Sequence, residues 1–394
     1  DLHLSIRRQR QMCIRDRIYL DNAATTKPNQ AVLDSFLKVS EKAYYNANSP
    51  HQMGLQSEKI LLQAKSRVKE MLNLNKNADI IFTSGATESN NIALKGIALR
   101  KKQFANVIIT SVLEHPSVLE VMRYLETQGF ILKYVNVTPN GQIDINHLEQ
   151  LMTDNVGLVT CMYVNNVMGQ IQPIKEIGSL LKQYPKAHFH VDGVQALGKI
   201  PMQLEDVNSI SFSGHKFNGL KGQGILIIDN KEKIEPTIFG GGQEYGIRSG
   251  TVNLAMNVSL VKAMEIAIQN LNELNHRLSR YNKVIRECLG QYKGMYINSP
   301  ENSAPHILNI AFPGVKGEVL VNAFSKLDIM VSTTSACSSK REKLNEVLLA
   351  MGIKDNRIEG SVRLSMGETT TEKDIEQFKD KLELIYAQIK ELLK

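Results

Sequence analysis

The sequence predicts an α/β fold with a mostly parallel sheet, followed by a smaller α+β region. Short β-branched runs alternate with longer amphipathic stretches from Ile18 onward, which is the pattern of strands joined by crossover helices. After about Leu254 a long helical pattern over 258–288 is followed by short strand-like pieces and a final helix. The length of 394 residues allows two or three domains.

The expected elements follow from these two sequence patterns, one before and one after about Leu254. In the first region the expected strands are 79–83, 106–110, 131–137, 157–164, 188–191, 209–213 and 224–228, and the expected helices are 58–72, 89–100, 118–128, 143–152 and 174–182. In the second region the expected strands are 295–297, 307–311, 328–331 and 361–364, with a final helix over 372–393. Short β-branched runs favour buried strands, whereas apolar residues at helical spacing favour helices packed against them.

The composition is that of an ordinary globular protein, with 42% hydrophobic and 22% charged residues. Four cysteines without CxxC or Cys/His spacing argue against a disulfide scaffold and a metal site, and they favour a reducing compartment, which we expect to be the cytoplasm. No apolar stretch approaches the roughly 20 residues of a membrane helix. The net charge of +7 is weak evidence for an acidic partner, and no nucleic-acid-binding motif accompanies it.

Residues 1–17 differ from the rest of the chain, because they hold five arginines and no apolar periodicity. We expect them to be a non-native leader without a function. The remaining chain is expected to form a segment, 18–30, that joins the small domain, then a large domain, 31–255, and a small carboxyl-terminal domain, 256–394.

A lysine and an aspartate stand at the ends of two predicted strands. Lys216 lies in SFSGHKFNGLKGQG, where desolvation would lower the pKa of its amine and favour a Schiff base, although a surface-loop lysine would look the same. Asp192 ends the strand in HFHVDGVQ. A carboxylate there either pairs with a positive group, such as the pyridinium nitrogen of pyridoxal phosphate (PLP), or caps a helix. Gln195, three residues on, could bond the hydroxyl of the same ring.

The segment TSGATESNN joins a predicted strand to a predicted helix. The backbone N–H groups of a helix start favour an anion, and Thr87 beside Ala86 adds a hydroxyl, so the segment could hold a phosphate. Ser213 and His215 flank the candidate lysine and could reach the same phosphate. The pattern is common on its own, and the absence of GxxxxGK[ST] excludes a P-loop.

Three further side chains are candidates with open roles. Cys337, in SACSSK, is flanked by small polar residues and by basic residues that would favour the nucleophilic thiolate over a buried thiol. His115, in LEHPS, could stack on a cofactor ring and move protons, or it could be structural. Arg363, in SVRLS, could bind the carboxylate of an amino acid or form a surface salt bridge.

Together and in this order, the motifs resemble those of one family, the PLP-dependent cysteine desulfurases of the NifS/IscS type in the class V aminotransferase group. The resemblance covers Ile18 to the carboxyl end and rests on YLDNAATT, TSGATESNN, EHPSVL, NNVMGQIQPI, HVDGVQALGK, SFSGHKFNGLKGQG, GGGQEYGIRSGTVN, SACSS and VRLSMG. It implies the PLP-dependent transferase fold type I, with a seven-stranded sheet in the large PLP-binding domain and the catalytic cysteine loop in the small domain.

The resemblance also implies a role for each matching residue. The implied cofactor contacts are Lys216 for the Schiff base, Asp192 for the pyridinium nitrogen, Gln195 for the ring hydroxyl, His115 stacked on the ring, and Ala86, Thr87, Ser213 and His215 for the phosphate. Thr251 is implied to reach the phosphate of a neighbouring subunit, and hence a homodimer. Asn165 and Arg363 are implied to hold the substrate carboxylate. Lys216, His115 and Cys337 are the implied catalytic residues, and no metal is implied.

The implied reaction removes sulfur from L-cysteine, giving L-alanine and a persulfide on Cys337 that passes to an acceptor for iron–sulfur cluster assembly or tRNA thiolation. The alternatives are a selenocysteine lyase and a class V aminotransferase without sulfur transfer, and the latter would not need Cys337. A silent scaffold would be expected to lose Lys216 or Asp192. The sequence departs from the family pattern at Val167, where an acidic residue is usual, and at Tyr245, where a basic one is frequent.

Overall fold

The computed structural model describes residues 17–333 and 344–392, which form two compact units. The large unit comprises residues 26–165 and 170–272, and the small unit the remainder. Helix α8 (Leu254–Gln269) lies within the large unit. The domain bounds expected from the sequence stay a prediction, because compact packing units need not fold as independent domains.

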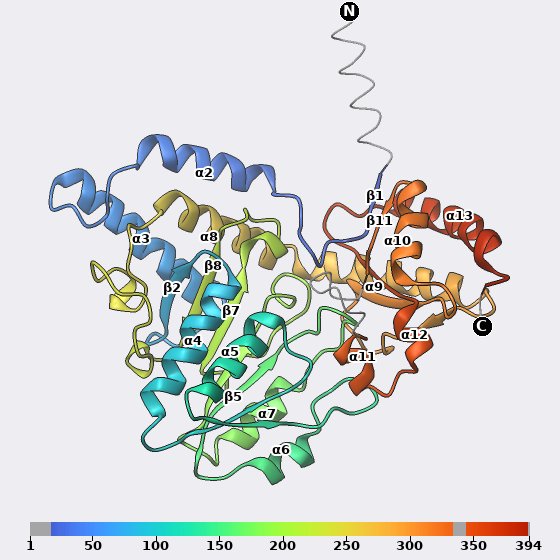
Figure 1. Ribbon diagram of the computed structural model, residues 1–394. Helices are drawn as coiled ribbons and strands as arrows, with labels where there is room; N and C mark the ends of the chain where they lie inside the picture. Colours follow the sequence, from blue (N-terminus) through green and yellow to red (C-terminus); the bar gives the residue numbers. More distant parts are fainter. Residues whose placement is uncertain (1–16, 334–343, 393–394) are drawn as a thin grey trace, which may run out of the picture. The chain divides into compact units, whose positions relative to one another are not determined.

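A seven-stranded sheet forms the centre of the large unit (Figure 1). Its strands, in order across the sheet, are β2 (Asp79–Thr83), β8 (Gly224–Ile228), β7 (Ser209–Ser213), β6 (His188–Asp192), β5 (Val156–Met162), β3 (Val107–Thr110) and β4 (Ile131–Tyr134). Only β8 runs antiparallel to its neighbours. Every residue of β3, β5, β6, β7 and β8 is buried, as expected for strands covered on both faces. The predicted α/β fold with a mostly parallel seven-stranded sheet is therefore confirmed.

The helices of the large unit lie around this sheet or pack on other helices of the unit (Figure 1). They are α2 (Gln30–Lys42), α3 (Gln52–Met71), α4 (Ala86–Lys101), α5 (Pro116–Thr127), α6 (Ile145–Leu151), α7 (Ile174–Leu181) and α8. Helix α4 contacts β2, β5, β6, β7 and β8, and α8 packs on α2 and α3. Three short 3₁₀ turns complete the unit: η1 (Gly214–Lys216), η2 (Lys231–Lys233) and η3 (Glu244–Gly246). The apolar residues of α4 from Ile92 to Ala98 lie in one cluster with those of α5 and the central strands, so this part of α4 is packed against the sheet.

The small unit has its own sheet and core. A parallel pair joins β1 (Ile18–Tyr19) to β11 (Ile329–Met330), and an antiparallel sheet has the order β12 (Ser332–Thr333), β13 (Ser361–Ser365), β10 (Ile307–Ala311) and β9 (Tyr296–Ile297). Its helices are α9 (Leu271–Leu289), α10 (Gly317–Lys326), α11 (Glu346–Ala350), α12 (Asp355–Glu359) and α13 (Glu372–Ile389). Apolar residues of β1, β10, β13, α9, α10 and α13 form one buried cluster.

The structure corrects the expected elements at one helix and adds elements that were not expected. The single helix expected over 258–288 is two helices, α8 and α9, separated at Asn270, whose φ of −91° and ψ of 0° leave the helical region. No glycine or proline marks that break in the sequence. Helices α2, α10, α11 and α12 were not among the expected elements, and α11 and α12 are only five residues long.

Candidate active site

The polar residues singled out in the large unit follow the carboxyl ends of its strands. Thr83 of β2, Gly224 of β8 and Ser213 of β7 are directly paired across the sheet, and Asp192 ends β6 one strand further on. Helix α4 begins three residues after β2, and the turn η1 with Lys216 begins directly after β7. Ligands of open α/β sheets bind at this edge, so the fold brings the candidates to the expected place.

The start of α4 forms a cradle for an anion. Its N-cap is Gly85, so no side chain caps the helix, and the N–H groups of its first turn, Ala86 and Thr87 included, point out of the helix end. A Cβ on Gly85 would lie 3.6 Å from Ser213 Oγ, which places that hydroxyl beside the turn. A Cβ on Gly224 would lie 2.4 Å from Gly85 Cα, so only glycine lets β8 approach so closely. These features favour a phosphate.

Asp192 is buried and is held by neutral donors. Its Oδ2 accepts a hydrogen bond from Asn90 Nδ2 (2.9 Å), and its Oδ1 accepts one from Val194 N–H (3.0 Å). The carboxylate is 5% exposed, and no cation forms a salt bridge with it in the described part of the chain. A buried carboxylate needs a positive partner, which a ligand can provide here.

The charges of Asp192 and Lys216 both reach His115. It caps α5, with Nδ1 accepting from Ser117 N–H (3.1 Å) and lying 2.9 Å from Ser117 Oγ. Although its side chain is exposed to solvent, surrounding protein atoms desolvate the imidazolium and lower its pKa. The charge of Asp192 opposes this shift and that of Lys216 adds to it, so all three groups share one electrostatic environment.

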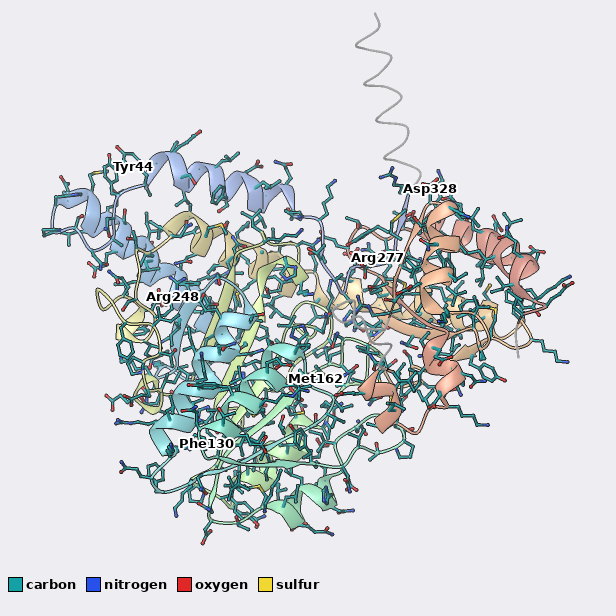
Figure 2. The ribbon with its side chains drawn as sticks, in the orientation of Figure 1. Tyr44, Phe130, Met162, Arg248, Arg277 and Asp328 are labelled. Atoms are coloured by element: carbon teal, nitrogen blue, oxygen red, sulfur yellow. The ribbon has the colours of Figure 1, made fainter. Side chains whose placement is uncertain are left out.

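The remaining cofactor candidates lie on the same unit. His215, in η1, has its pKa lowered to about 4 by desolvation and by the nearby Lys216 and Lys221, so its imidazole is neutral near pH 7. Gln195 is buried three residues after β6. Thr251 is exposed and lines a hollow of about 270 Å³ together with Ser84 and Arg248 (labelled in Figure 2).

The two candidates for binding a substrate carboxylate belong to different units. Asn165, in the large unit, is fully buried after β5 and donates from Nδ2 to the carbonyl of Leu113 (3.0 Å). Arg363, in β13 of the small unit, donates from Nη2 to Asp21 Oδ1 and from Nη1 to the carbonyl of Asn166, both at 2.9 Å. Arg363 is thus a buried paired arginine rather than a surface one. Cys337 lies outside the described residues.

The structure adds three polar groups that the sequence reasoning missed. Asn90 and Ser117 connect Asp192 to His115 by hydrogen bonds. Glu114 is 4% exposed, and burial raises its pKa to about 8. Its Oε1 accepts from Met162 N–H (2.9 Å; Met162 is labelled in Figure 2) and from Ser111 Oγ (3.1 Å). All three lie in motifs that carry the family resemblance, TSGATESNN and EHPSVL, but nothing in the sequence assigned them a role.

Two ion pairs hold the glycine-rich loop after β8 in place. Arg248 Nε donates to Glu88 Oε1 (2.9 Å), and Lys65 Nζ donates to the buried Glu244 Oε2 (2.7 Å). Burial alone would raise the pKa of Glu88, but the bonds from Arg248 and from Ser84 N–H lower it. Tyr245, one of the two positions at which the sequence departs from the family pattern, has φ of 60°. Lys65 Nζ lies over its ring, 4.2 Å from the ring centroid. These contacts fix the loop that carries Thr251.

The family model of class V aminotransferases matches residues 18–378. The chain belongs to this family. A NifS/IcsS protein homolog of Lactobacillus delbrueckii subsp. bulgaricus is 40% identical over 94% of this chain and 97% of its own length. A cysteine desulfurase IscS of Clostridium botulinum is 37% identical over 95% of this chain and 96% of its own length. A solved NifS-like structure superposes with a TM-score of 0.88 at 37% identity, over 94% of this chain and all of that one. The predicted NifS/IscS-type resemblance is therefore confirmed.

The described residues fit the PLP cofactor of the class V family. The α4 cradle suits its phosphate, the buried Asp192 carboxylate suits its ring nitrogen, and Lys216, in the turn directly after β7, is in electrostatic reach of His115. Among residues 17–333 and 344–392, no cluster of His, Cys, Asp and Glu could hold a metal ion. Over the same residues, every helix is too short or too polar to cross a membrane.

Proposed function

We propose that the carboxyl edge of the large unit is the active site of a PLP-dependent cysteine desulfurase. The observation that carries this proposal is the convergence of the α4 amino terminus, the Asp192 carboxylate and the Lys216 turn at one sheet edge. Relatives named cysteine desulfurase over nearly the whole chain support the reaction, in which L-cysteine loses its sulfur and leaves as L-alanine.

The chain's own residues divide the work at the site. Bound PLP supplies an electron sink for the bond broken at the substrate α-carbon. Lys216 holds the cofactor and, at Nζ, carries the proton that the α-carbon loses. Asp192 keeps the ring nitrogen protonated, since a buried anion favours the cationic partner. The phosphate is held by the α4 N–H groups of Ala86 and Thr87 with the side chains of Thr87, Ser213 and His215, and Gln195 bonds the ring hydroxyl.

Cys337 is the proposed sulfur acceptor. Its thiol gains one sulfur atom, so that an S–S bond forms while the C–S bond of cysteine breaks, and no external oxidant or reductant is needed. The balance gives one alanine and one persulfide for each cysteine. Lys340 and Arg341 follow Cys337 in the sequence, and their charge favours the thiolate. Arg363 and Asn165 are the proposed groups for the substrate carboxylate, because a guanidinium matches a carboxylate with two donors.

A second copy of the chain is the proposed partner. Large apolar side chains lie exposed on α2, on α3, on the segment between them and on the loop after β8: Leu37 is 56% exposed, Tyr44 (Figure 2) 70%, Leu62 58% and Phe239 83%. Such exposure favours an interface. In a homodimer, Thr251 is proposed to reach the cofactor phosphate of the other copy. The persulfide is proposed to pass to an iron–sulfur scaffold or a thiouridine synthase in the cytoplasm, where the free thiols of Cys161 and Cys288 remain reduced.

The deciding experiment is the visible spectrum of the protein with PLP, before and after L-cysteine, with alanine and sulfide assayed in the same tube. We expect an absorbance band that changes with cysteine while alanine appears. Lys216→Ala should abolish the band and the activity, whereas the control Lys221→Ala, an exposed lysine of the same loop, should keep both. Cys337→Ser should keep the band and lose persulfide formation.

Two results would contradict this assignment. A protein that stays colourless and inactive with PLP would exclude the cofactor role of the site. A Cys337→Ser variant that releases alanine and sulfide at the wild-type rate would show that Cys337 is not the sulfur acceptor.

A further inference from the structure

One amide connects the two ends of the candidate active site. Asn90 is fully buried on α4. Its Nδ2 donates to Asp192 Oδ2 at 2.9 Å and to Ser117 Oγ at 3.0 Å, while its Oδ1 lies 3.1 Å from His190 Nε2. Both amide hydrogens and the carbonyl oxygen are therefore in use, and the orientation of the amide follows from its partners.

We propose that Asn90 is a positioning residue for the desulfurase reaction: it holds the Asp192 carboxylate in place and, through Ser117, keeps His115 as the neutral tautomer with its proton on Nε2. This inference rests on the proposed function for its catalytic meaning, but the hydrogen-bond arrangement itself can be tested without turnover.

The histidine side of the network fixes which way Asn90 points. Because Asn90 Oδ1 can only accept, His190 must carry its proton on Nε2, and its Nδ1 then accepts from Ser209 Oγ at 2.8 Å. Ser209, having given its proton to His190, accepts from His188 Nε2 at 2.8 Å. Burial lowers the pKa of His190 to about 3 and that of His188 well below its ordinary value. Both rings are thus neutral, and the chain of donors and acceptors has one consistent direction.

The His115 side follows by the same proton count. Ser117 Oγ accepts from Asn90, so its own proton is available for His115 Nδ1 at 2.9 Å. Ser117 N–H points at the same Nδ1 from 3.1 Å. A proton on Nδ1 would face that N–H, and the helix N–H would then have no acceptor. His115 therefore accepts at Nδ1 and keeps its proton at Nε2.

This arrangement defines what His115 can do in the reaction. A ring whose Nδ1 is engaged by the helix cap can exchange protons only at Nε2, so His115 acts as a donor there and its ring plane is set by the cap. The charges that reach the ring are the Asp192 carboxylate, which raises its pKa, and the Lys216 ammonium, which lowers it. Moving Asn90 would disturb both Asp192 and the proton position on His115.

The first test uses cofactor-free protein labelled with ¹⁵N in its histidines. We expect the wild-type spectrum near pH 7.5 to show His115 with an unprotonated Nδ1 and a protonated Nε2, assigned by comparison with His115→Gln. A protonated Nδ1 would overturn the inference whatever the enzyme's activity. Conversely, a protein that fails to bind PLP would contradict the proposed function and leave this spectrum readable.

The second test compares Asn90→Ala with Ser89→Ala. Ser89 is the adjacent buried polar residue of α4, and its Oγ bonds Thr83 Oγ1 at 2.7 Å without touching Asp192 or Ser117. Without Asn90, Ser117 Oγ is free to accept from Nδ1–H, and only the Ser117 N–H still favours an unprotonated Nδ1. Asn90→Ala should therefore populate some of the other His115 tautomer beside the original one. It should also shift the pH titration of the bound cofactor's absorbance and lower kcat about tenfold to a hundredfold, with little change in KM.

Ser89→Ala should keep the wild-type His115 spectrum, cofactor titration and kcat, even where it lowers stability. If Asn90→Ala matched Ser89→Ala in all three readouts, Asn90 would be a structural residue only. Should Asn90→Ala fail to fold, the wild-type spectrum alone still decides whether His115 carries its proton on Nε2.

Discussion

Two buried polar centres of this molecule are built in opposite ways. At the carboxyl edge of the large unit, the Asp192 carboxylate is held by an amide and a backbone N–H, which orient it without neutralising it. In the small unit, the Arg363 guanidinium is met by the carboxylate of Asp21 and the carbonyl of Asn166. The first centre keeps its full charge for a ligand, whereas the second already has a counter-ion.

The difference teaches how to distinguish a preorganised charge from a compensated one. Neutral donors satisfy the hydrogen-bonding needs of a carboxylate, but leave its field intact for a cation that arrives later. An ion pair such as Arg363–Asp21 reduces the field that an incoming carboxylate would feel. Substrate binding at Arg363 would therefore depend on geometry more than on net charge.

The strongest test of this contrast is Asp192→Asn. The amide would keep the size of the side chain but remove the charge that favours a protonated cofactor ring. Since breaking a buried charge pair costs about 3–5 kcal/mol, kcat for alanine release should fall on the order of 10²–10⁴-fold. The control is Asp144→Asn, which replaces the N-cap of α6 with another good cap. Unchanged kcat in Asp192→Asn would show that Asp192 serves only as a hydrogen-bond acceptor within the protein, for Asn90 Nδ2 and Val194 N–H.

The second test concerns the compensated centre. Arg363→Lys keeps the positive charge but loses the planar fork that holds Asp21 and the Asn166 carbonyl together. KM for L-cysteine should rise about tenfold to a hundredfold, the equivalent of losing one charged hydrogen bond. The control Arg357→Lys alters an arginine that bonds Asn298 and the carbonyl of Ile297 in the same unit and should leave KM alone. An unchanged KM in Arg363→Lys would remove Arg363 from the substrate site.

A third test separates two neighbouring buried carboxyl groups. Burial raises the pKa of Glu114 to about 8, and the charge of Asp192 adds to that shift. The folded protein therefore keeps a proton on Glu114 that the unfolded chain, with its ordinary pKa of 4.5, has already lost. Stability from this group is present below about pH 4.5 and is lost as the pH rises toward 8.

Glu114→Gln mimics the protonated form at every pH. Measured by urea unfolding, the free energy of unfolding of Glu114→Gln relative to wild type should rise by about 1–2 kcal/mol between pH 6 and 8. Glu149→Gln, an exposed site, should show no such trend. A difference between Glu114→Gln and wild type that stays constant with pH would mean that Glu114 is ionised when buried, and the contrast with Asp192 would disappear.

The sequence could predict much of the frame but few of the contacts. Strands β2, β7 and β8 have the predicted bounds, since β-branched runs bounded by polar turns identify buried strands. The role of Asn90 could not be predicted, because its partner Asp192 lies 102 residues away, and the Arg363–Asp21 pair spans 342 residues. The helix break at Asn270 has no glycine or proline signal. Residue types and local periodicity predict elements, whereas long-range pairing appears only in the fold.

The mildest change in the compensated centre is Asp21→Asn. The side-chain oxygen can still accept from Arg363 Nη2, now at 2.9 Å from Asp21 Oδ1, so the guanidinium should keep its orientation. The competing negative charge is gone, and an incoming carboxylate should be attracted more strongly, by about 0.2–1 kcal/mol as for a partly exposed pair. KM for L-cysteine should therefore fall a few-fold, with kcat unchanged, and the fall should shrink at high salt.

The matched control is Asp328→Asn, which removes a carboxylate of the same unit whose ion pair with Arg17 is more than half exposed. That variant should leave KM unchanged. If Asp21→Asn raised KM instead, the carboxylate would be needed to hold Arg363 in place, and the ion pair would be a positioning device rather than a competitor for the substrate. In that case both polar centres would follow one rule, in which protein groups orient the charge that the ligand meets.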